Sequence, residues 1–383
     1  MRIGIVGAGI GGLVAAAALQ RDGHEVALLE RQERPGAVGA GLSLFGNSFA
    51  ALDAVGLGGL VGPLTSEEPP AFTAGQRTPS GRWLLVMPRD AVSAMRVLHR
   101  ADLHHALSAA LRPGTLRAGI EASVAADGSP TLTVSGQDER FDLVIAADGI
   151  RSEARRSLGL DTGVRYAGYT AWRAVTREPV DVAGDAGETW GRGERFGVAP
   201  LPDGRVYWFA TRTLPAGTAY RDERREVLAR FGSWHDPIPA LIDATDPEAV
   251  LRHDIHDLAR PLASYARGRT ILLGDAAHAM TPDLGQGAGQ AIEDAATIAL
   301  LLRRGGIDES VRAYDLDRRR RSQPIARRSH ATGRVAQLAS PIAAARDALL
   351  ALTPPGLVAR ASLRVQQWRP PGAVSAVGRS LGP

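Results

Sequence analysis

Short apolar runs that end in glycine or aspartate divide much of the chain into alternating strands and helices. Residues 3–6 predict a buried strand, and the alanine-rich residues 13–20 predict a helix that ends at Gly23. Three further apolar runs predict strands at residues 25–29, 141–147 and 270–273, which are followed by Glu30, Asp148 and Gly274. Strands that alternate with helices predict an α/β fold with a parallel sheet.

The pattern changes between residue 166 and about residue 260. Runs rich in aromatic residues, separated by Gly and Pro, predict strands at residues 169–175, 196–200 and 205–211, and a weakly alternating run predicts an earlier strand at residues 83–87. Alternation along the last run places Arg205, Tyr207, Phe209 and Thr211 on one face. We expect a mainly antiparallel second sheet, with one face packed on helices and the other available to wall a pocket.

The remaining segments predict helices, loops and one short hairpin. Residues 117–124 and 131–134 predict strands joined by a turn at Asp127-Gly128. Asn47 or Ser48 is expected to cap a helix that runs to about residue 55, and Asp308 to cap a long arginine-rich helix bent at Pro324. Further helices are predicted at residues 101–111, 221–231, 343–352 and 357–367, loops at residues 36–46 and 63–81, and a loose tail after residue 370.

Composition excludes several classes of chemistry. The 383 residues carry a net charge of only +4, and no basic run is interleaved with aromatic residues, so we expect no nucleic-acid partner. All 45 basic residues are arginine, which excludes Schiff-base lysines and the P-loop lysine. The absence of cysteine excludes disulfides, thiolate nucleophiles and cysteine-based zinc sites, and we expect no metal centre.

The first predicted strand leads into a glycine motif. Gly7, Gly9 and Gly12 form G-x-G-x-x-G between a strand and a helix, and Glu30 closes the next strand about 20 residues further on. In such a unit the glycines allow a tight turn, a close approach of the backbone to a pyrophosphate, and close helix packing. The motif therefore predicts dinucleotide binding, although Glu30 does not distinguish FAD from NAD. The glycine spacing also argues against reading residues 3–19 as a signal peptide, and no stretch of about 20 uncharged apolar residues predicts a membrane span.

A second glycine-rich helix start lies near the predicted fourth strand of this sheet. Asp275 stands at the carboxyl end of that strand, and Gly285, Gly287 and Gly289 open the helix that follows. Unpaired N–H groups at a helix start suit an anion or an electron-rich carbonyl.

Three stretches together resemble the class A flavoprotein monooxygenases, the FAD-dependent aromatic hydroxylases of the p-hydroxybenzoate hydroxylase type. They are GAGIGG with Glu30, AADGIRSEAR at residues 146–155, and GDAAHAMTPDLGQGAGQAIEDA at residues 274–295. The likeness covers roughly residues 1–340, and HRADLHHAL at residues 99–107 also looks like the family's.

The resemblance implies a set of FAD contacts. The ADP half would be held by Gly7, Gly9, Gly12 and Glu30, with Arg31 beside the adenosine. Arg100 would reach the pyrophosphate or ribitol, Asp148 would belong to a motif associated with FAD and NAD(P)H, and Asp275 would bond a ribitol hydroxyl. Pro282 would lie beside the isoalloxazine, and N–H groups near its pyrimidine end would come from Gly285, Gln286, Gly287 and Ala288.

The resemblance also implies the reaction. NADPH or NADH would reduce FAD, O2 would add to give a C4a-hydroperoxyflavin, and one oxygen atom would pass to an aromatic or similarly electron-rich small molecule. The flavin would swing between its reduction and oxygenation positions. No catalytic base is identifiable; by position on the second sheet the candidates for the substrate site are Arg173, Arg205 and Tyr207, beside Pro282.

The implied architecture is a Rossmann-like FAD-binding domain of the p-hydroxybenzoate hydroxylase type with an inserted substrate domain and C-terminal helices. We expect FAD-binding parts at residues 1–70, 97–165 and 268–340, substrate-domain parts at 71–96 and 166–267, and C-terminal helices and tail at 341–383. The expected setting is cytoplasmic, as a monomer or homodimer. Two alternatives stay open: a flavin-dependent reductase or dehydrogenase of the same fold, and a non-catalytic dinucleotide- or partner-binding protein.

Overall fold

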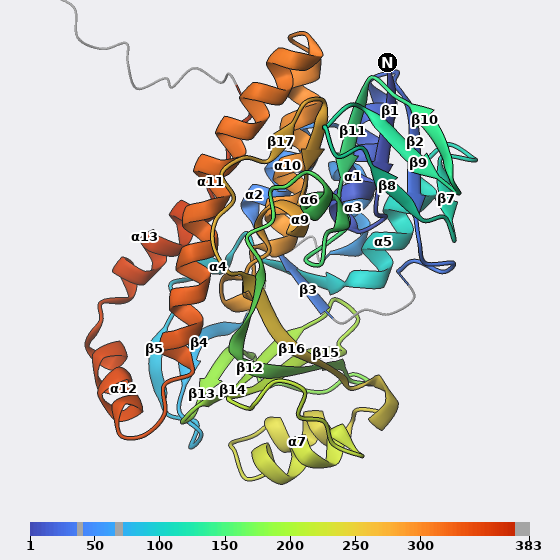
Figure 1. The fold of residues 1–383 in the computed structure, drawn as a ribbon. Helices are drawn as coiled ribbons and strands as arrows, with labels where there is room; N and C mark the ends of the chain where they lie inside the picture. Colours follow the sequence, from blue (N-terminus) through green and yellow to red (C-terminus); the bar gives the residue numbers. More distant parts are fainter. Residues whose placement is uncertain (37–40, 66–71, 372–383) are drawn as a thin grey trace, which may run out of the picture.

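Two large sheets, with one long helix alongside both, form the two halves of the molecule (Figure 1). The computed structural model describes residues 1–36, 41–65 and 72–371. The predicted tail after residue 370 therefore lies almost entirely outside the described residues. Figure 1 shows the six-stranded sheet in the upper half, the seven-stranded sheet in the lower half, and helix α11 (Ile307–Ala336) alongside both.

The six-stranded sheet has the order β17-β18-β11-β1-β2-β7, and its pairs are parallel except β17 with β18. Its strands are β1 (Arg2–Val6), β2 (Glu25–Glu30), β7 (Leu116–Ala118), β11 (Leu143–Ala146), β17 (Ala266–Arg267) and β18 (Thr270–Leu272). The inner strands carry Ile3, Ile5, Ile145 and Ile271, all fully buried. Helices cover a parallel sheet on both faces, so continuous apolar runs are what such strands need. The four strands predicted from those runs are confirmed.

Helices α1 (Ile10–Arg21) and α10 (Gly287–Leu302) pack against each other and against this sheet. Gly11 marks their contact, because a Cβ there would meet side-chain atoms of Leu273 and Ala291. Nearly every residue of α1 is buried in consequence.

The seven-stranded sheet has the order β16-β12-β15-β14-β13-β4-β5. All its pairs are antiparallel except β13 with β4, which confirms a mainly antiparallel second sheet. Its strands are β4 (Thr73–Arg77), β5 (Trp83–Val86), β12 (Val164–Val175), β13 (Asp185–Trp190), β14 (Glu194–Pro200), β15 (Val206–Arg212) and β16 (Leu251–Leu258).

The two faces of this sheet have different partners. Trp172, Phe196 and Trp208 point to one face, where they form a core with helices α7 (Glu223–Phe231) and α8 (Ile238–Asp243). Because strand residues alternate, Arg173 and Phe209 point to the opposite face. We call it the inner face, since it looks toward the six-stranded sheet.

Smaller elements complete the chain. A two-stranded sheet pairs β3 (Gly41–Leu44) with β6 (Arg96–His99), and a three-stranded sheet contains β8 (Ala122–Val124), β9 (Thr131–Val134) and β10 (Gln137–Arg140). The other helices are α2 (Gly46–Ala54), α3 (Gly58–Val61), α4 (Arg89–Val92), α5 (Arg100–Ala109), α6 (Glu153–Ser157), α9 (Asp275–His278), α12 (Ile342–Leu352) and α13 (Pro355–Gln366). Short 3-10 helices occur at η1 (Gly62–Leu64), η2 (Pro247–Ala249) and η3 (Pro282–Leu284).

Some predictions about strands are wrong. The predicted loop at residues 63–81 contains β4, whose sequence Thr-Ala-Gly-Gln-Arg has no apolar alternation and which is held by pairing with β13. The predicted loop at residues 36–46 contains β3; residues 37–40 and 66–71 of these two loops lie outside the described residues. The single strand predicted at 117–124 is two strands in different sheets, separated at Gly119 by a positive φ of 71°.

The helix caps predicted at Asn47 or Ser48 and at Asp308 are also wrong. Helix α2 has Phe45 at its N-cap, and Asn47 and Ser48 are fully buried inside the helix. Helix α11 has Gly306 at its N-cap and continues through Pro324, while Asp308 accepts two hydrogen bonds from Arg269, at 2.6 and 2.8 Å.

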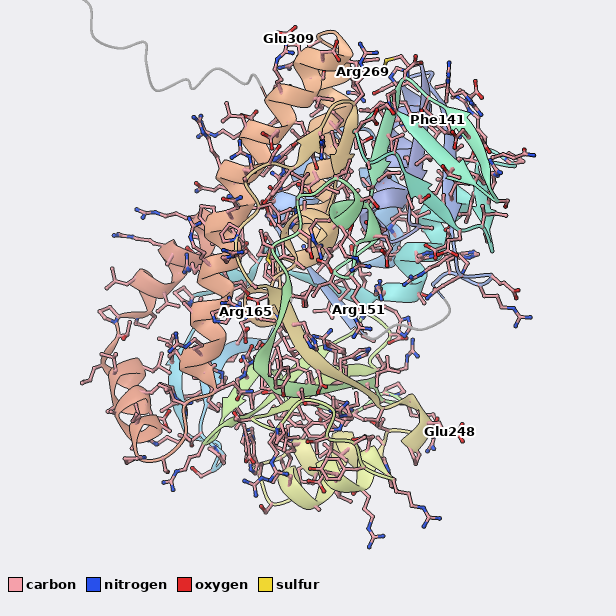
Figure 2. The ribbon with its side chains drawn as sticks, in the orientation of Figure 1. Phe141, Arg151, Arg165, Glu248, Arg269 and Glu309 are labelled. Carbon is pink, nitrogen blue, oxygen red and sulfur yellow. The ribbon has the colours of Figure 1, made fainter. Side chains whose placement is uncertain are left out.

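The sheets are linked where β12 and β16 cross from one half of the molecule to the other. Arg165 of β12 donates to both carboxylate oxygens of Asp257 on β16, at 2.7 and 2.9 Å. Figure 2 labels Arg165 at the level where the upper and lower halves meet. This pairing raises the pKa of Arg165, so the bridge stays charged at ordinary pH.

A cluster of buried charges joins α10 to α11. Arg318 of α11 contacts Asp294 at 2.5 Å and Glu293 at 2.8 Å, and Arg321 contacts Glu293 at 3.0 Å. Burial favours the protonated carboxyls, but the neighbouring His278 and Arg318 outweigh it and lower the pKa of Asp294. Arg318 likewise outweighs burial at Glu293, whose pKa is also lowered.

No single helix among the described residues is long and apolar enough to cross a membrane. Helices α12 and α13 reach the required length and composition only together, across a bend of 93°.

Replacing Arg318 should destabilise the fold strongly. Arg318→Ala leaves two buried carboxylates without their main partner, and we expect a loss of about 3–5 kcal/mol in the free energy of unfolding. Chemical denaturation of the variant beside the unchanged protein measures it. The difference should shrink as the pH falls through about 4, because protonated carboxyls no longer need the arginine.

Arg320→Ala is the matched control, since Arg320 is exposed on the same helix. Its effect should stay within about 0.5 kcal/mol. Equal losses in the two variants would show that the buried cluster contributes nothing specific.

Candidate active site

Three functional candidates follow neighbouring parallel strands. In register, Val6 of β1 pairs with Ala146 of β11, and Ala146 pairs with Leu272 of β18. Gly7, Asp148 and Asp275 therefore emerge at the same edge of the sheet, at the carboxyl ends of its strands. Ligands of open α/β sheets bind at this edge.

In the loop after β1, the three motif glycines Gly7, Gly9 and Gly12 have different surroundings. Gly7 has φ of 101°, and a Cβ there would overlap the carbonyl oxygen of Ala147. A Cβ at Gly12 would overlap the carbonyl oxygen of Gly7. At Gly9 a Cβ would meet nothing within 4 Å. The fold itself thus requires Gly7 and Gly12, whereas Gly9 leaves the start of α1 bare toward open space, as a pyrophosphate would need.

Both polar backbone groups of Ala8 in this loop are fixed. Glu30 accepts hydrogen bonds from the N–H groups of Ala8 and Gln32, at 2.8 and 2.9 Å. The carbonyl of Ala8 lies 2.9 Å from Nε2 of buried His104, whose pKa is lowered by burial, so a neutral imidazole donates this bond. His104 lies within the stretch HRADLHHAL but is not among the site residues predicted from the sequence. Arg31, next to Glu30, is exposed.

The second strand end carries a buried acceptor that the protein does not use. Oδ2 of Asp148 accepts a hydrogen bond from the N–H of Ala154 at 3.0 Å, but Oδ1 is buried without a partner among the described residues. Beside it Gly149 has φ of 82° and open space where a Cβ would stand. A buried acceptor next to bare backbone fits a ligand that brings hydroxyl donors, such as the ribitol or ribose of FAD.

The third strand end presents a carboxylate to solvent. Asp275 is exposed in spite of following a buried strand. The protein mass around it raises the pKa of its carboxyl, an effect that the neighbouring His278 and Arg100 oppose. Arg100 is the first residue of α5, and its charge acts on Asp275 across the strand ends. The pair offers one acceptor and one cation to a ligand that carries hydroxyls and phosphates.

The start of α10, like the start of α1, has glycines that leave the backbone uncovered. Gly285 adopts the left-handed conformation, with φ of 63° and ψ of 17°, which turns the chain into the helix. Gln286 is the buried N-cap residue, and its side chain accepts a hydrogen bond from Asn47 at 3.0 Å rather than capping the helix. A Cβ at Gly287 would meet nothing within 4 Å, and Ala288 is only partly buried. The first N–H groups of α10 are thus available to an anion or a carbonyl.

A buried ion pair joins this loop to the second sheet. Arg195 on the inner face of β14 donates to Asp283 at 2.6 Å, and both side chains are almost fully buried. Tyr169 of β12 donates to the other oxygen of Asp283 at 2.8 Å. Burial opposes the charge of Arg195, but Glu188 and Asp283 outweigh it and raise its pKa. Asp283 follows Pro282, which is exposed at the start of η3, so this pair fixes the backbone beside Pro282.

The sequence analysis missed Arg195, Asp283 and Tyr169. Asp283 lies within the quoted motif, but the strand expected at 196–200 began one residue too late to include Arg195. The residue that Arg195 meets across the two sheets depends on the order of the strands, and the periodicity of the sequence does not give that order.

The three substrate-site candidates on the second sheet have different surroundings. Tyr207 is buried on the inner face, and its ring would overlap a Cβ at Gly41 of β3. Arg173 lies on the same face and is partly buried; its charge acts on Tyr207 and on His253. Arg205 lies outside β15, in the preceding turn, where it pairs with Asp203 at 2.7 Å. The expectation that Arg205 shares a strand face with Tyr207 is therefore wrong.

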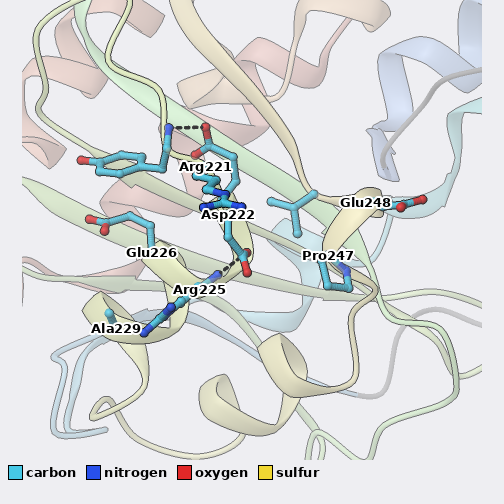
Figure 3. Close-up of a pocket in the computed structure, with 10 residues that line it drawn as sticks. Arg221, Asp222, Arg225, Glu226, Ala229, Pro247 and Glu248 are labelled. Carbon is cyan, nitrogen blue, oxygen red and sulfur yellow. Dashed lines mark hydrogen bonds between the residues drawn. The ribbon is translucent and has the colours of Figure 1, made fainter.

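A hollow of about 840 Å³ lies elsewhere, beside α7 (Figure 3). Two of its carboxylates already have structural partners: Asp222 caps α7 through the N–H of Arg225, and Glu223 accepts from Trp172 at 2.6 Å. Trp172 points away from the inner face, so this hollow is on the opposite side of the sheet from Arg195. It is not part of the candidate site.

The comparisons with known proteins identify the family of the chain. A family model described as an FAD binding domain matches residues 1–329. Aurachin C monooxygenase/isomerase of Stigmatella aurantiaca is 40% identical over 309 residues, which cover 78% of this chain and 79% of that protein. The 2-heptyl-3-hydroxy-4(1H)-quinolone synthase of Pseudomonas aeruginosa strain UCBPP-PA14 is 33% identical over 366 residues, covering 92% and 94%.

The fold comparison gives the same answer. The crystal structure of Klebsiella pneumoniae HpxO complexed with FAD and uric acid superposes with a TM-score of 0.85 and 27% identity, covering 96% of each chain. The resemblance carried by the three motifs is thereby confirmed. The chain belongs to the class A flavoprotein monooxygenases of the p-hydroxybenzoate hydroxylase type, FAD-dependent enzymes that use NAD(P)H and O2 to hydroxylate aromatic or similarly electron-rich small molecules.

Proposed function

We propose that this chain hydroxylates an electron-rich nitrogen heteroaromatic ring of the quinolone kind, held between the inner face and an FAD bound at the strand ends. The observation that carries the proposal is the inner face itself. Tyr207 and Phe209 form an apolar cluster there with Val97 of β6, and the Asp283 loop closes against the same face. The names of two relatives or neighbours, a quinolone synthase and a protein complexed with uric acid, point to ligands with nitrogen-containing rings.

The dinucleotide half of FAD would lie along the glycine loop. Gly9 leaves room for the pyrophosphate against the start of α1, with Gly7 and Gly12 shaping the turn. Glu30 would accept from ribose hydroxyls with its remaining lone pairs, and Arg31 would lie by the adenosine. Ala8 would stay fixed between Glu30 and His104.

The flavin half would meet the other two strand ends. The orphaned oxygen of Asp148 and the exposed carboxylate of Asp275 would accept from hydroxyls, and Arg100 would reach the pyrophosphate or ribitol. The bare N–H groups from Gly285 to Ala288 would stabilise negative charge at the pyrimidine end of the ring, with Gln286 fixed by Asn47. Bound FAD supplies the redox chemistry between NAD(P)H, O2 and the substrate.

The protein's own residues position the reaction and keep water from it. Arg195 and Tyr169 hold Asp283, which fixes Pro282 beside the ring. Tyr207 and Phe209 would stack against the substrate ring, and the cation of Arg173 would orient an electron-rich oxygen on it. We assign no catalytic base. Because NAD(P)H is the electron donor, we propose a cytoplasmic setting.

Gly9→Ala should weaken FAD binding without harming the fold. The backbone at Gly9 has φ of −69° and ψ of 176°, which alanine adopts freely, and the added methyl group meets no protein atom. We expect the dissociation constant for FAD to rise by about tenfold or more, which corresponds to about 1.4 kcal/mol. Quenching of flavin fluorescence on titration of apoprotein measures it.

Gly59→Ala is the control, because Gly59 also has open space around a Cβ but lies in α3, away from the strand ends. If both variants bind FAD as the parent does, the glycine loop does not carry the pyrophosphate.

Arg195→Gln should uncouple NAD(P)H oxidation from hydroxylation. It leaves the buried Asp283 carboxylate with Tyr169 as its main donor, so the loop beside Pro282 loses its fixed position. We expect the ratio of hydroxylated product to NAD(P)H consumed to fall severalfold, with a matching rise in hydrogen peroxide. Tyr169→Phe keeps the ion pair and should give a smaller change in the same direction.

Arg205→Gln makes the same chemical change at a turn outside the inner face, and its ratio should stay at the parent value. A parent-like ratio in Arg195→Gln, with FAD bound, would contradict the proposed role of the Asp283 loop.

The substrate class is tested directly with the purified yellow protein. We expect 4(1H)-quinolones to give hydroxylated products that contain one ¹⁸O atom from ¹⁸O2, detected by mass spectrometry, and to do so with higher kcat/KM than salicylate or urate. Preference for salicylate or urate would overturn the quinolone assignment. Product formed in stoichiometric amount without oxygen would instead favour a reductase or dehydrogenase.

A further inference from the structure

The most exposed large apolar side chains of the described residues gather on two helices. Ile342, Leu349 and Leu352 of α12 and Leu357 of α13 are 58–81% exposed, whereas every other large apolar side chain that the structure describes is at most 47% exposed. Figure 1 shows both helices at the outer left edge of the molecule, away from the strand ends. A cluster of this kind marks an interaction surface.

The three of these side chains that belong to α12 form one stripe that the structure holds outward. Positions 342, 345, 349 and 352 follow a spacing of three and four residues, so Ile342, Leu349 and Leu352 share one face of α12. The opposite face carries Arg346, which is buried and donates to the carbonyls of Ala336 and Gly191, at 2.7 and 2.8 Å. The stripe therefore stands on a helix that is fixed to the rest of the protein.

The segment of the chain that contains the stripe is strongly basic. Residues 318–371 contain 11 of the 45 arginines but only one of the 41 acidic residues, Asp347, which is paired with Arg346. Seven of these arginines are exposed, and they include Arg334 near the end of α11 and Arg360 and Arg364 on α13. The rest of the chain, residues 1–317, thus carries a net negative charge.

We propose that α12 and α13 bind the surface of an anionic lipid bilayer, with the leucine stripe entering the headgroup region and the arginines contacting acidic headgroups. Helices that lie in a membrane interface combine an apolar face with Arg or Lys on the flanks. A second copy of the chain fits less well, because a two-fold contact would place the exposed arginines of the two copies against one another. The two helices rest on the bilayer and do not cross it.

Flotation of the FAD-loaded full-length protein with lipid vesicles tests the proposal. We expect at least about tenfold tighter binding to vesicles of phosphatidylcholine with phosphatidylglycerol than to phosphatidylcholine alone, and weaker binding as salt rises. The double variant Leu349→Ser/Leu352→Ser should weaken binding by about tenfold or more, because two apolar side chains no longer enter the interface. Arg360→Gln and Arg364→Gln should each weaken it by about fivefold.

Each variant has a matched control. Leu316→Ser also removes an exposed leucine, but one that lies between Asp315 and Asp317 on α11, and Arg140→Gln removes an exposed arginine on β10. Both controls should bind vesicles as the parent does, and all variants should keep the parent's flavin content and NAD(P)H oxidation.

Three outcomes would overturn the proposal. They are no binding to the anionic vesicles, binding that Leu349→Ser/Leu352→Ser does not weaken, and a dimer without lipid that this double variant converts to monomer. The last outcome would assign the stripe to a second copy of the chain. None of these measurements depends on which substrate the active site accepts.

Discussion

The buried contact of Arg318 with Glu293 and Asp294 is the constraint on which the geometry of the site depends. Asp294 also accepts hydrogen bonds from the N–H of Gly274 at 2.8 Å and lies 2.7 Å from Nε2 of His278. One carboxylate thus fixes the turn after β18, the short helix that begins at Asp275, and the interior of α10. Burying three charges costs solvation free energy, and a well-packed apolar group would not incur that cost. An apolar group would not, however, fix the start of α10 relative to the strand end.

The loop between Asp275 and the start of α10 is also held by residues of the seven-stranded sheet and of α11. Arg195 and Tyr169 hold Asp283 from the inner face, and Oγ of Ser329 on α11 donates to the carbonyl of Thr281 at 2.6 Å. Gly333 of α11 lies so close that a Cβ would overlap the Asp283 carboxylate. Strands β12 and β14 and helix α11, which are distant in the sequence, therefore fix the position of this one short loop where the two sheets meet.

The sequence predicted the parts of the site that local geometry controls. Gly7 and Gly12 are readable because each is required by a turn or a close approach within its own βαβ unit, and Asp148 and Asp275 are readable because apolar runs end beside them. Arg195 was not readable, since its role depends on β14 lying between β13 and β15 and on the loop it meets across the two sheets. Arg205 was chosen instead because alternation along one strand is visible, whereas the residue at which a strand begins is not. The polar strand β4 was missed for a related reason: its stability comes from β13, not from its own pattern.

Because the loop is held from two sides, it also affects how the enzyme brings NAD(P)H and the substrate in turn to the flavin. The flavin must meet NAD(P)H and then the substrate, and a site can achieve this by moving the cofactor or by moving the protein around it. The loop from Asp275 to Gly287 is held at one end by Asp294, in the middle by Arg195 and Ser329, and at its close by Gln286 with Asn47. Moving it would break buried ion pairs and hydrogen bonds at several points at once, each of them expensive to leave unpaired. The loop therefore acts as a fixed support, against which a bound flavin ring would have to move to meet both partners.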